Sequence, residues 1–404
     1  MKKYLVTGMF IVLLSVVTIW SFVVPQRKYS DLENRNLQQF PKVSVKSVLN
    51  GNFQEKYETA LADQIFLRDN WVDIYAKLEQ FIGKKEINDV YLGKDGYLIE
   101  KYEEQDFDKK LEEENIKQLS NFLNVTSQQF GKEHVSCMFV PSKINVLDNK
   151  MSVQDKEYDG GKVVEQIQQQ VDDKSRVINL ENILKKHNDE YIYYRTDHHW
   201  TTLGAYYGYC AYENMNNRKV APLKDYKREV VFDDFYGTTY NKAHTFVKPD
   251  EVEIFHTDYE NVKINMNNDE IKSDTFYFKD VAQKSFDRYQ LFFSKNTGKI
   301  EIQTSAKNDK TLLVIKDSYA NCFVPFLAGE YSKIIMIDCR YTRLKMKTIL
   351  REYQEVSDIL VLFNIEKFRK DTHLTSLKLT KEDLKKEEET QEEDDIFGDL
   401  ISLD

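Results

Sequence analysis

The stretch TLLVIKDSYAN, residues 311–321, contains an unbroken run of Leu, Val and Ile at 312–315, which is followed by Lys316, Asp317 and Ser318. Such a run is typical of a strand buried on both faces of a parallel sheet. The mostly apolar residues 319–329 that follow favour a helix. The stretch therefore predicts a buried strand, a polar turn and a helix, which together form the repeating unit of an α/β fold.

The same alternation continues on both sides of this stretch. We expect strands at 135–140, 176–180, 191–194, 333–337 and 358–363, and helices at 163–171, 180–187, 201–212 and 344–353. Residues 226–302 differ, because short aromatic segments and turn residues replace the helical pattern. The predicted fold class is α/β: a parallel sheet at 88–380 with helices on both faces and a β-rich insertion at about 226–302.

The amino-terminal segment is long enough to cross a membrane. Residues 4–24 contain no charge and follow Met1-Lys2-Lys3; as a helix they span roughly 30 Å. A cleaved signal peptide is the alternative, although no A-x-A-like site precedes Pro25. We favour an uncleaved signal anchor at 1–25. The lysines then keep the amino terminus inside, and a single-pass protein of the cell membrane carries its main domain outside the cytoplasm.

Residues 26–87 are predicted to form a connector and a helical collar. Apolar residues recur at helical spacing at 53, 57, 60 and 61, and again at 71, 74, 75, 78 and 82. Asp69 is the expected N-cap of the second helix, and Gly83 the residue that follows its end. Residues 89–99 read as a hairpin that turns at Asp95-Gly96.

The charge of the chain is concentrated at its carboxyl end. The net charge is −10, but residues 381–404 hold eleven acids and three bases, so they account for −8 and leave the rest near neutral. We expect this acidic tail to be disordered. A near-neutral folded part does not favour nucleic-acid binding, which needs a basic face.

The segment YYRTDHHWTTLGAYYGY, residues 193–209, carries the clearest chemical signal. Asp197 and His199 are two residues apart, so in an extended segment their side chains project to the same side. A carboxylate in that position can orient an imidazole and stabilise its charged form. His198 points the other way and is expected to pack or to support the site. The alternative is a histidine cluster that only supports a loop.

A histidine base needs a nucleophile, and Ser318 is the candidate. It is expected just beyond the carboxyl end of a strand, where backbone N–H groups at a helix start can bind an oxyanion. The alternative is that Ser318 only caps the helix. Cys322 is a rival nucleophile, but its apolar neighbours favour the core. The other cysteines are far apart and form no C-x-x-C pair, so a zinc site is not expected.

Asp197-His198-His199-Trp200, preceded by an aromatic strand and followed by Thr-Thr-Leu-Gly-Ala-Tyr, resembles the signature of the DHHW protein family. That family is similar to the alginate O-acetyltransferases of the SGNH-like hydrolase superfamily. Those enzymes carry Asp-x-His-Trp and a later Ser, which match Asp197, His199, Trp200 and Ser318. Segments 33–35, 63–68, 93–98 and 140–143 are similar too. Lys316 departs from the glycine that often precedes Asp-Ser, and no carboxy-terminal sugar-binding domain is apparent.

The resemblance implies an SGNH hydrolase-like fold and an extracytoplasmic carbohydrate O-acetyltransferase that acts on a polysaccharide. Ser318 would take the acyl group, His199 would act as the base and Asp197 would orient it; with water as acceptor the same site is an esterase. No metal or cofactor is implied, and a membrane-bound O-acyltransferase partner would supply acyl groups. Supporting or substrate-binding roles then fall to His198, Trp200, Tyr193, Tyr194 and Lys143, although the three aromatic residues also suit a core.

Two other classes of function stay open. Asp-His-His also occurs in metal-dependent phosphoesterases of the DHH superfamily, which need further aspartate clusters to hold two metals. No such cluster follows the early strands. The second alternative is a non-catalytic protein of cell-envelope assembly or binding that keeps the fold.

Overall fold

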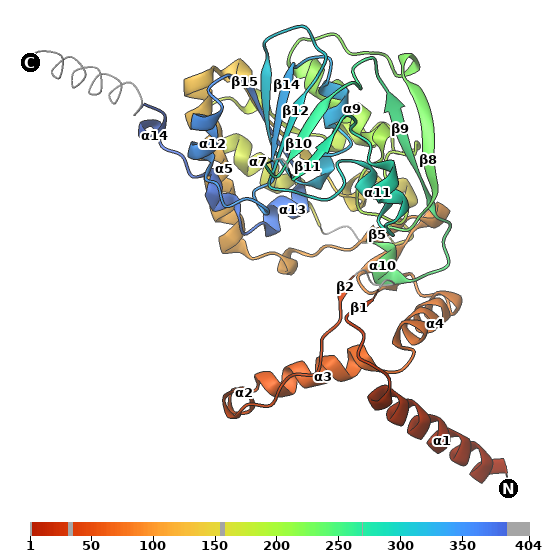
Figure 1. The fold of residues 1–404 in the computed structure, drawn as a ribbon. Helices are drawn as coiled ribbons and strands as arrows, with labels where there is room; N and C mark the ends of the chain where they lie inside the picture. Colours follow the sequence, from red (N-terminus) through yellow and green to blue (C-terminus); the bar gives the residue numbers. More distant parts are fainter. Residues whose placement is uncertain (1, 31–34, 154–157, 269, 386–404) are drawn as a thin grey trace, which may run out of the picture.

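A mixed sheet of eight strands forms the centre of the protein (Figure 1), in the order β11-β10-β12-β14-β13-β15-β6-β7. The structure is a computed structural model that describes all residues except 1, 31–34, 154–157, 269 and 386–404. The strands of this sheet are β6 (Val135–Val140), β7 (Val177–Asn179), β10 (Lys263–Met266), β11 (Ile271–Ser273), β12 (Lys299–Gln303), β13 (Thr311–Lys316), β14 (Lys333–Ile337) and β15 (Val356–Asn364).

The five strands β14, β13, β15, β6 and β7 run parallel to one another. All residues of β13 and β6 are buried, because helices or loops cover both faces of the sheet. The predicted buried strands at 135–140, 311–315, 333–337 and 358–363 are therefore confirmed. A mixed α/β fold with a large central sheet follows from this arrangement.

The strands β10, β11 and β12 lie in the region predicted as a β-rich insertion, but they join the central sheet, which is therefore mixed rather than parallel throughout. These strands pair antiparallel to each other and to β14. Ile264, Met266, Ile300 and Ile302 are fully or almost fully buried, so the alternating residues of β10 and β12 pack on the same core as the parallel strands. Half of the predicted insertion thus extends the central sheet rather than forming a separate lobe. Its other half is a hairpin of β8 (Lys227–Phe235) and β9 (Asp250–His256).

Helices cover both faces of the sheet. On the face that carries Leu313 and Ile315 lie α5 (Lys109–Phe130), α7 (Gly161–Gln170) and α12 (Met346–Glu352). The face of Leu312 and Val314 packs against α9 (Thr202–Met215) and the β8–β9 hairpin. The shorter helices are α6 (Lys143–Val146), α8 (Glu181–Lys185), α10 (Tyr240–Ala243), α11 (Lys279–Gln283), α13 (Ile365–Lys370) and α14 (Lys381–Lys385).

Two predicted elements near the candidate site are wrong. Residues 191–194 form only an isolated bridge between Tyr193 and Trp200. The predicted helix at 319–329 is a pair of 3-10 turns, η8 (Ser318–Ala320) and η9 (Val324–Leu327), because Pro325 lacks the N–H that would bond to the carbonyl of Asn321 in a continuous α-helix. Other 3-10 turns are η1 (Lys94–Gly96), η2 (Glu104–Asp106), η3 (Lys132–His134), η4 (Asp148–Lys150), η5 (Lys174–Arg176), η6 (Leu223–Asp225), η7 (Arg288–Leu291) and η10 (Leu374–Leu377).

The amino-terminal part projects from the main domain (Figure 1). It contains α1 (Lys2–Val23), the short pair β1 (Tyr29–Ser30) and β2 (Arg35–Asn36), α2 (Val45–Leu49), α3 (Asn52–Gln64) and α4 (Arg68–Phe81). Within α1, Tyr4–Val23 is long and apolar enough to cross a membrane, which suits either an anchor or a signal sequence. The Arg35 guanidinium pairs with both carboxylate oxygens of Asp63, at 3.0 and 2.6 Å.

The boundaries of the predicted collar are partly right. Leu67, not Asp69, is the N-cap of α4, because the Asp69 carboxylate accepts hydrogen bonds from Arg27 and Ser30 instead. Gly83 follows the helix with a φ of 91°, as predicted. The predicted hairpin is confirmed as β4 (Val90–Leu92), η1 and β5 (Leu98–Glu100), with β3 (Glu86–Ile87) beside it.

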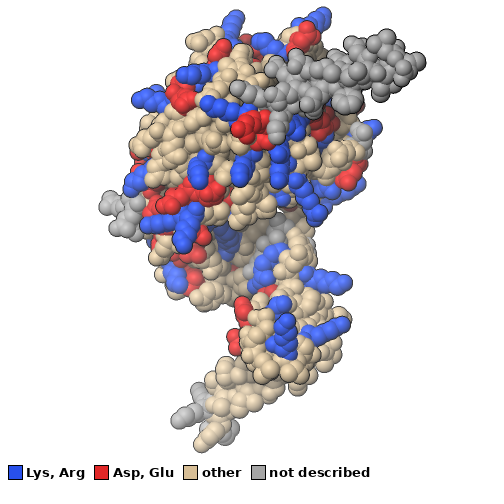
Figure 2. All heavy atoms as spheres, turned by 90° about the vertical axis from the view of Figure 1, so that its left-hand side faces the viewer, with Lys and Arg blue, Asp and Glu red and all other residues tan. Residues whose placement is uncertain are grey.

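Charge is mixed over the face drawn in Figure 2, where Lys and Arg lie among Asp and Glu. The predicted disordered tail falls mostly outside the described residues, which end at 385. Its first residues, Lys381–Lys385, form α14.

Candidate active site

Asp197, His199 and Ser318 form one hydrogen-bonded chain. His199 Nδ1 lies 2.5 Å from Asp197 Oδ1, and His199 Nε2 lies 2.7 Å from Ser318 Oγ. The His199 backbone N–H also donates to Asp197 Oδ1 at 2.9 Å. With its proton on Nδ1, the imidazole donates to the carboxylate and can accept from the serine hydroxyl. The three side chains predicted from the sequence therefore lie together, with His199 within hydrogen-bonding distance of both Asp197 and Ser318.

Ser318 reaches this position because β13 ends at Lys316, at the carboxyl edge of the sheet. The Asp317 carboxylate accepts from Tyr319 N at 2.9 Å and from Asn364 N, at the end of β15, at 2.8 Å. Asp317, not Ser318, therefore caps the following turn. The helix-cap alternative for Ser318 is wrong in this structure, and its hydroxyl is available to His199.

The β8–β9 connection holds the other oxygen of Asp197. Asp197 Oδ2 accepts from Thr238 N at 2.8 Å and from Thr238 Oγ1 at 3.1 Å. Burial raises the pKa of Asp197, but the electrostatic interactions with the His198 and His199 imidazoles and the hydrogen bonds from His199 outweigh burial and hold the pKa well below its usual range. The carboxylate is therefore ionised when it faces the imidazole.

Gly237 is required by this close approach. A Cβ at Gly237 would lie 2.2 Å from Asp197 Cβ and 2.4 Å from Asp197 Oδ2. Any larger residue would push the carboxylate or the loop out of place.

The His199 ring contacts two other rings. Tyr289 stacks on it, with centroids 3.8 Å apart and an angle of 10° between the planes. The His198 ring is tilted by 35° to it, with centroids 3.9 Å apart. Tyr289 also donates its hydroxyl to the backbone carbonyl of Ser318 at 3.0 Å, so one side chain contacts both the His199 ring and the Ser318 backbone.

His198 is not part of the hydrogen-bonded chain of Asp197, His199 and Ser318, but it contacts residues beside that chain. Its Nδ1 lies 2.5 Å from Thr238 Oγ1, and its carbonyl accepts from the Tyr319 hydroxyl at 2.5 Å. Burial and the neighbouring His199 lower the pKa of His198 well below its usual value. His198 is therefore neutral and acts as a fixed spacer between Thr238 and His199.

Trp200, Tyr193 and Tyr194 are fully buried, so the structure favours the core alternative for all three. The Trp200 indole donates to Tyr319 O at 2.9 Å. Lys143 is also buried, and its ammonium donates to the carbonyls of Leu98, Tyr194 and Arg195. Burial lowers the pKa of Lys143 to about 8. Lys143 ties the hairpin to the segment that leads into Asp197.

Four residues around the site were not predicted from the sequence: Gly237, Thr238, Asp250 and Tyr289. Asp250 accepts from the backbone N–H groups of Arg195 and Thr196 and so fixes the residues before Asp197. All four belong to the 226–302 region, which has no motif in the sequence. Their roles depend on how this region folds back over the sheet edge, and local spacing carries no signal for that.

Cys322 is not placed as a nucleophile. It is 1 % exposed, and burial raises the pKa of its thiol to about 12, so the reactive thiolate is disfavoured. All four cysteines are free.

Among the described residues, Asp197, His198 and His199 are the group close enough to share a metal ion. Asp197 and His199, however, direct their facing atoms at each other.

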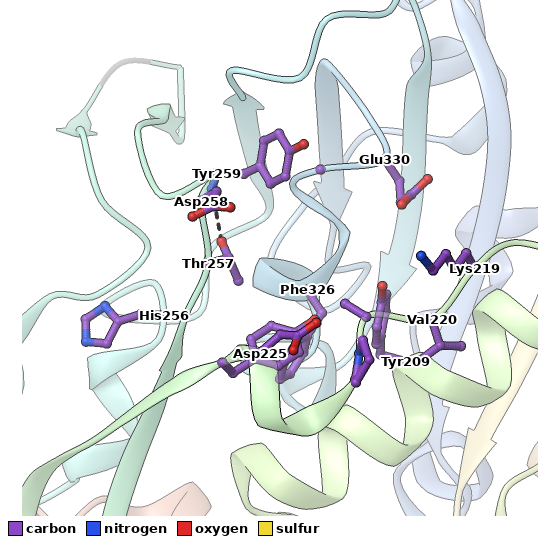
Figure 3. Close-up of a pocket in the computed structure, with 14 residues that line it drawn as sticks. Tyr209, Lys219, Val220, Asp225, His256, Thr257, Asp258, Tyr259, Phe326 and Glu330 are labelled. Carbon is purple, nitrogen blue, oxygen red and sulfur yellow. Dashed lines mark hydrogen bonds between the residues drawn. The ribbon is translucent and has the colours of Figure 1, made fainter.

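Two cavities differ in how close their lining residues come, along the sequence, to residues of the candidate site. The one in Figure 3, about 360 Å³, is lined by aromatic residues such as Tyr209, Tyr226 and Phe326 and contains none of Asp197, His199 and Ser318. The second, about 650 Å³, is lined by residues on either side of Thr238 and just before Tyr289. Its lining comprises Asp69, Asp234, Tyr236, Tyr240, Asn241, Gln283, Lys284, Ser285, Phe286 and Arg288.

Comparison with known structures agrees with this fold. A DHHW family protein from Eubacterium siraeum is 22% identical and has a TM-score of 0.58, covering 72% of this chain and 95% of that one. PatB1 of Bacillus cereus is 19% identical with a TM-score of 0.58, covering 71% and 98%. PatB1 with a sulfonyl adduct is 20% identical with a TM-score of 0.55, covering 72% and 99%. A comparison with curated proteins finds no match.

The family model described as DHHW protein matches residues 88–337. This range is more than half of the chain and includes Asp197, His198, His199, Trp200 and Ser318. This match and the shared fold confirm the resemblance to the DHHW family that the sequence motif predicted. The chain belongs to the DHHW family.

Proposed function

We propose that this protein is an extracytoplasmic carbohydrate O-acetyltransferase that works through an acyl-enzyme on Ser318. The observation that carries the proposal is the hydrogen-bonded chain from Asp197 through His199 to Ser318 Oγ, at 2.5 and 2.7 Å. A serine, a histidine base and an orienting carboxylate in this order are the parts that nucleophilic acyl transfer needs.

In the first step, His199 Nε2 takes the hydroxyl proton while Ser318 Oγ bonds to the acyl carbon of the donor. The donor's leaving group departs with the proton that His199 returns. In the second step, a carbohydrate hydroxyl gives its proton to His199 and its oxygen bonds to the acyl carbon. The Ser318 Oγ–carbon bond breaks, and Oγ recovers a proton. The ionised Asp197 stabilises the imidazolium in both steps.

The oxyanion in each step needs hydrogen-bond donors. The Ser318 N–H has no hydrogen-bond partner among the residues that the structure describes, and it is our candidate donor. The turn η8 is only three residues long, so a helix dipole adds little. Lys316, which replaces the usual glycine, directs its ammonium to Asn321 Oδ1 at 2.6 Å and so is occupied elsewhere.

The cavity of about 650 Å³ is the candidate acceptor site. Tyr236 and Tyr240 flank the Gly237–Thr238 segment that wraps Asp197, and Arg288 precedes Tyr289. Aromatic faces beside amide, carboxylate and guanidinium groups suit a sugar, which offers apolar C–H faces and many hydroxyls. The acyl donor in this proposal is a membrane-bound O-acyltransferase that α1 keeps nearby.

The test is acetyl release from a chromogenic acetate ester by the full-length protein, compared with Ser318→Ala and His199→Ala. We expect both variants to lose at least about 10³-fold in rate. Full activity in Ser318→Ala would contradict the proposal. Adding an oligosaccharide acceptor then separates the two outcomes of deacylation: transfer gives acetylated sugar, whereas an esterase gives only acetate.

A parallel measurement distinguishes an enzyme from a non-catalytic envelope protein. A sulfonyl fluoride should label Ser318 in the native chain and should not label Ser318→Ala. A chelator should leave acetyl release unchanged; loss of activity with chelator would favour the metal-dependent alternative. A chain that neither reacts nor releases acetate, yet binds polysaccharide, would be a binding protein.

A further inference from the structure

Helix α4 carries an apolar stripe that faces away from the protein. Residues at positions 71, 74, 75, 78 and 82 lie on one side of the helix, as their spacing predicts. They are exposed rather than packed: Trp71 44%, Ile74 56%, Tyr75 59%, Leu78 55% and Ile82 67%. No charged residue belongs to this set, which we call the α4 stripe. Soluble surfaces rarely leave such a contiguous patch uncovered.

The opposite side of α4 is held firmly against the main domain. Ala76 and Glu79 are buried. The Gln80 side chain donates to Phe246 O at 3.3 Å and accepts from Phe246 N at 2.6 Å, and Lys77 lies over the Phe246 ring at 5.1 Å. The stripe therefore faces outward because the helix is docked in this orientation.

The first turn of α4 is tied to the end of α1. The rings of Trp20 and Phe66 are 5.8 Å apart, and Phe66 N donates to Ser21 Oγ at 2.8 Å. The Arg27 guanidinium pairs with Asp69 Oδ2 at 2.5 Å. Trp20 and Ser21 lie in the last turn of α1, so Phe66 sits within roughly 5 Å of the helix end at 1.5 Å per residue. If α1 crosses a bilayer, α4 begins at the membrane surface.

We propose that the α4 stripe lies in the outer interface of the lipid bilayer, so that the chain contacts the membrane through α4 as well as α1. This inference rests on α1 being retained as a membrane span. Trp and Tyr are the residues that favour this depth. Their polar atoms are satisfied within the helix region, since Trp71 Nε1 donates to Phe66 O at 3.0 Å and Tyr75 OH to Glu79 at 2.6 Å. Their apolar surfaces are thus free to face acyl chains.

This placement orients the candidate active site. Helix α10 lies between α4 and the sheet (Figure 1), and its Tyr240 N donates to Thr196 O, next to Asp197, at 2.8 Å. The carboxyl edge of the sheet that holds Ser318 then faces the membrane. An acceptor polymer would be modified close to the bilayer, at a height set by α4.

The experiment uses the full chain in lipid nanodiscs, spin-labelled at Leu78→Cys, Val12→Cys or Lys307→Cys. Val12 lies within α1, and Lys307 is exposed on the loop before β13. The unsubstituted chain, labelled in parallel, gives the background from native cysteines. Accessibility to oxygen and to a water-soluble nickel chelate reports the depth of each label. We expect Leu78 to be several-fold less accessible to the nickel chelate than Lys307, and shallower than Val12.

Other results would overturn the inference in distinguishable ways. The label at Leu78 could be as accessible to the nickel chelate as the label at Lys307, while the label at Val12 lies in the bilayer core. In that case α1 spans the membrane but the α4 stripe does not touch lipid. Spin–spin broadening at Leu78 that disappears on dilution with unlabelled protein would mean that a second copy covers the stripe. If Val12 also reads as water, α1 is not a span and the premise is lost. None of these results bears on acetyl release by Ser318.

Discussion

The imidazole of His199 lies flat against the ring of Tyr289, with centroids 3.8 Å apart and planes inclined by 10°. Tyr289 comes from η7, in the region between β11 and β12, and its hydroxyl donates to Ser318 O at 3.0 Å. One residue from outside every recognisable motif therefore positions both the base and the nucleophile of the proposed reaction.

Replacing Tyr289 tests this positioning role. Tyr289→Phe keeps the stacked ring and loses the hydroxyl's hydrogen bonds to Ser318 O and to Cys322 Sγ, so acetyl release should fall less than about tenfold. Tyr289→Ala removes the ring and should cost about 10²-fold, because a small displacement of a catalytic group has a large effect on rate. The measurement is kcat and KM for acetyl release by Tyr289→Phe, Tyr289→Ala and the native chain. Equal rates for both variants would contradict a role for the stacked ring.

Gly237→Ala tests the close approach of the β8–β9 connection to Asp197. The new methyl group would overlap Asp197 Cβ at 2.2 Å, so we expect at least about 10²-fold lower activity. Gly161→Ala is the control, because its methyl group would meet only side-chain atoms, at 3.1 Å or more. If both variants keep full activity, the packing around Asp197 does not matter for the chemistry.

Asp197→Asn tests the charge that orients His199. An amide of the same shape cannot stabilise the imidazolium, and it favours the wrong tautomer, so the rate of acetyl release should fall about 10³- to 10⁴-fold. Asp358→Asn is the matched control: Asp358 is also a buried aspartate that contacts a histidine, at 2.7 Å from His134 Nδ1, but it lies in β15 near its amino end. That control should retain activity.

Glu213 predicts a pH dependence of stability. It is fully buried in α9, and burial raises its pKa from 4.5 to about 7. The unfolded chain loses this proton near pH 4.5 and the folded chain only near pH 7, so the stability contributed below pH 4.5 is lost as the pH rises through this window.

Glu213→Gln keeps a neutral side chain at every pH and should remove this dependence. Relative to the variant, the native chain should lose about 3 kcal/mol of unfolding free energy between pH 4.5 and 7.5. Thermal unfolding midpoints at several pH values measure the difference. Glu165→Gln, on the exposed side of α7, is the control. Parallel pH curves for Glu213→Gln and the native chain would contradict the prediction.

The parallel core and the Asp197–His199–Ser318 set could be predicted because their signals are local. Apolar runs such as residues 311–315 specify buried strands, and strand ends in a parallel sheet converge at one edge. The pairing of Asp197 with His199 follows from a two-residue spacing. Both signals can be recognised in the sequence alone, because they do not depend on the rest of the fold.

The remainder depended on tertiary contacts. β10 and β12 joined the central sheet because their buried residues complete its core, and nothing in their spacing specifies antiparallel pairing to β14. Pro325 converted a helical pattern into 3-10 turns. Tyr289, Thr238 and Asp250 reach the site only because the insertion folds back over the sheet edge. Their residue types and spacing therefore do not predict that they lie near Asp197 and His199. The α4 stripe was correctly predicted as one helical face, but not as an exposed one.

The most direct measurement is the mass of the protein after incubation with a chromogenic acetate ester, followed by localisation of the modification. The account predicts that one acetyl group is attached to Ser318, that it is absent from Ser318→Ala, and that a carbohydrate acceptor removes it. Acetylation at another residue, or rapid acetyl release by Ser318→Ala, would contradict the acyl-enzyme on which the proposed function depends.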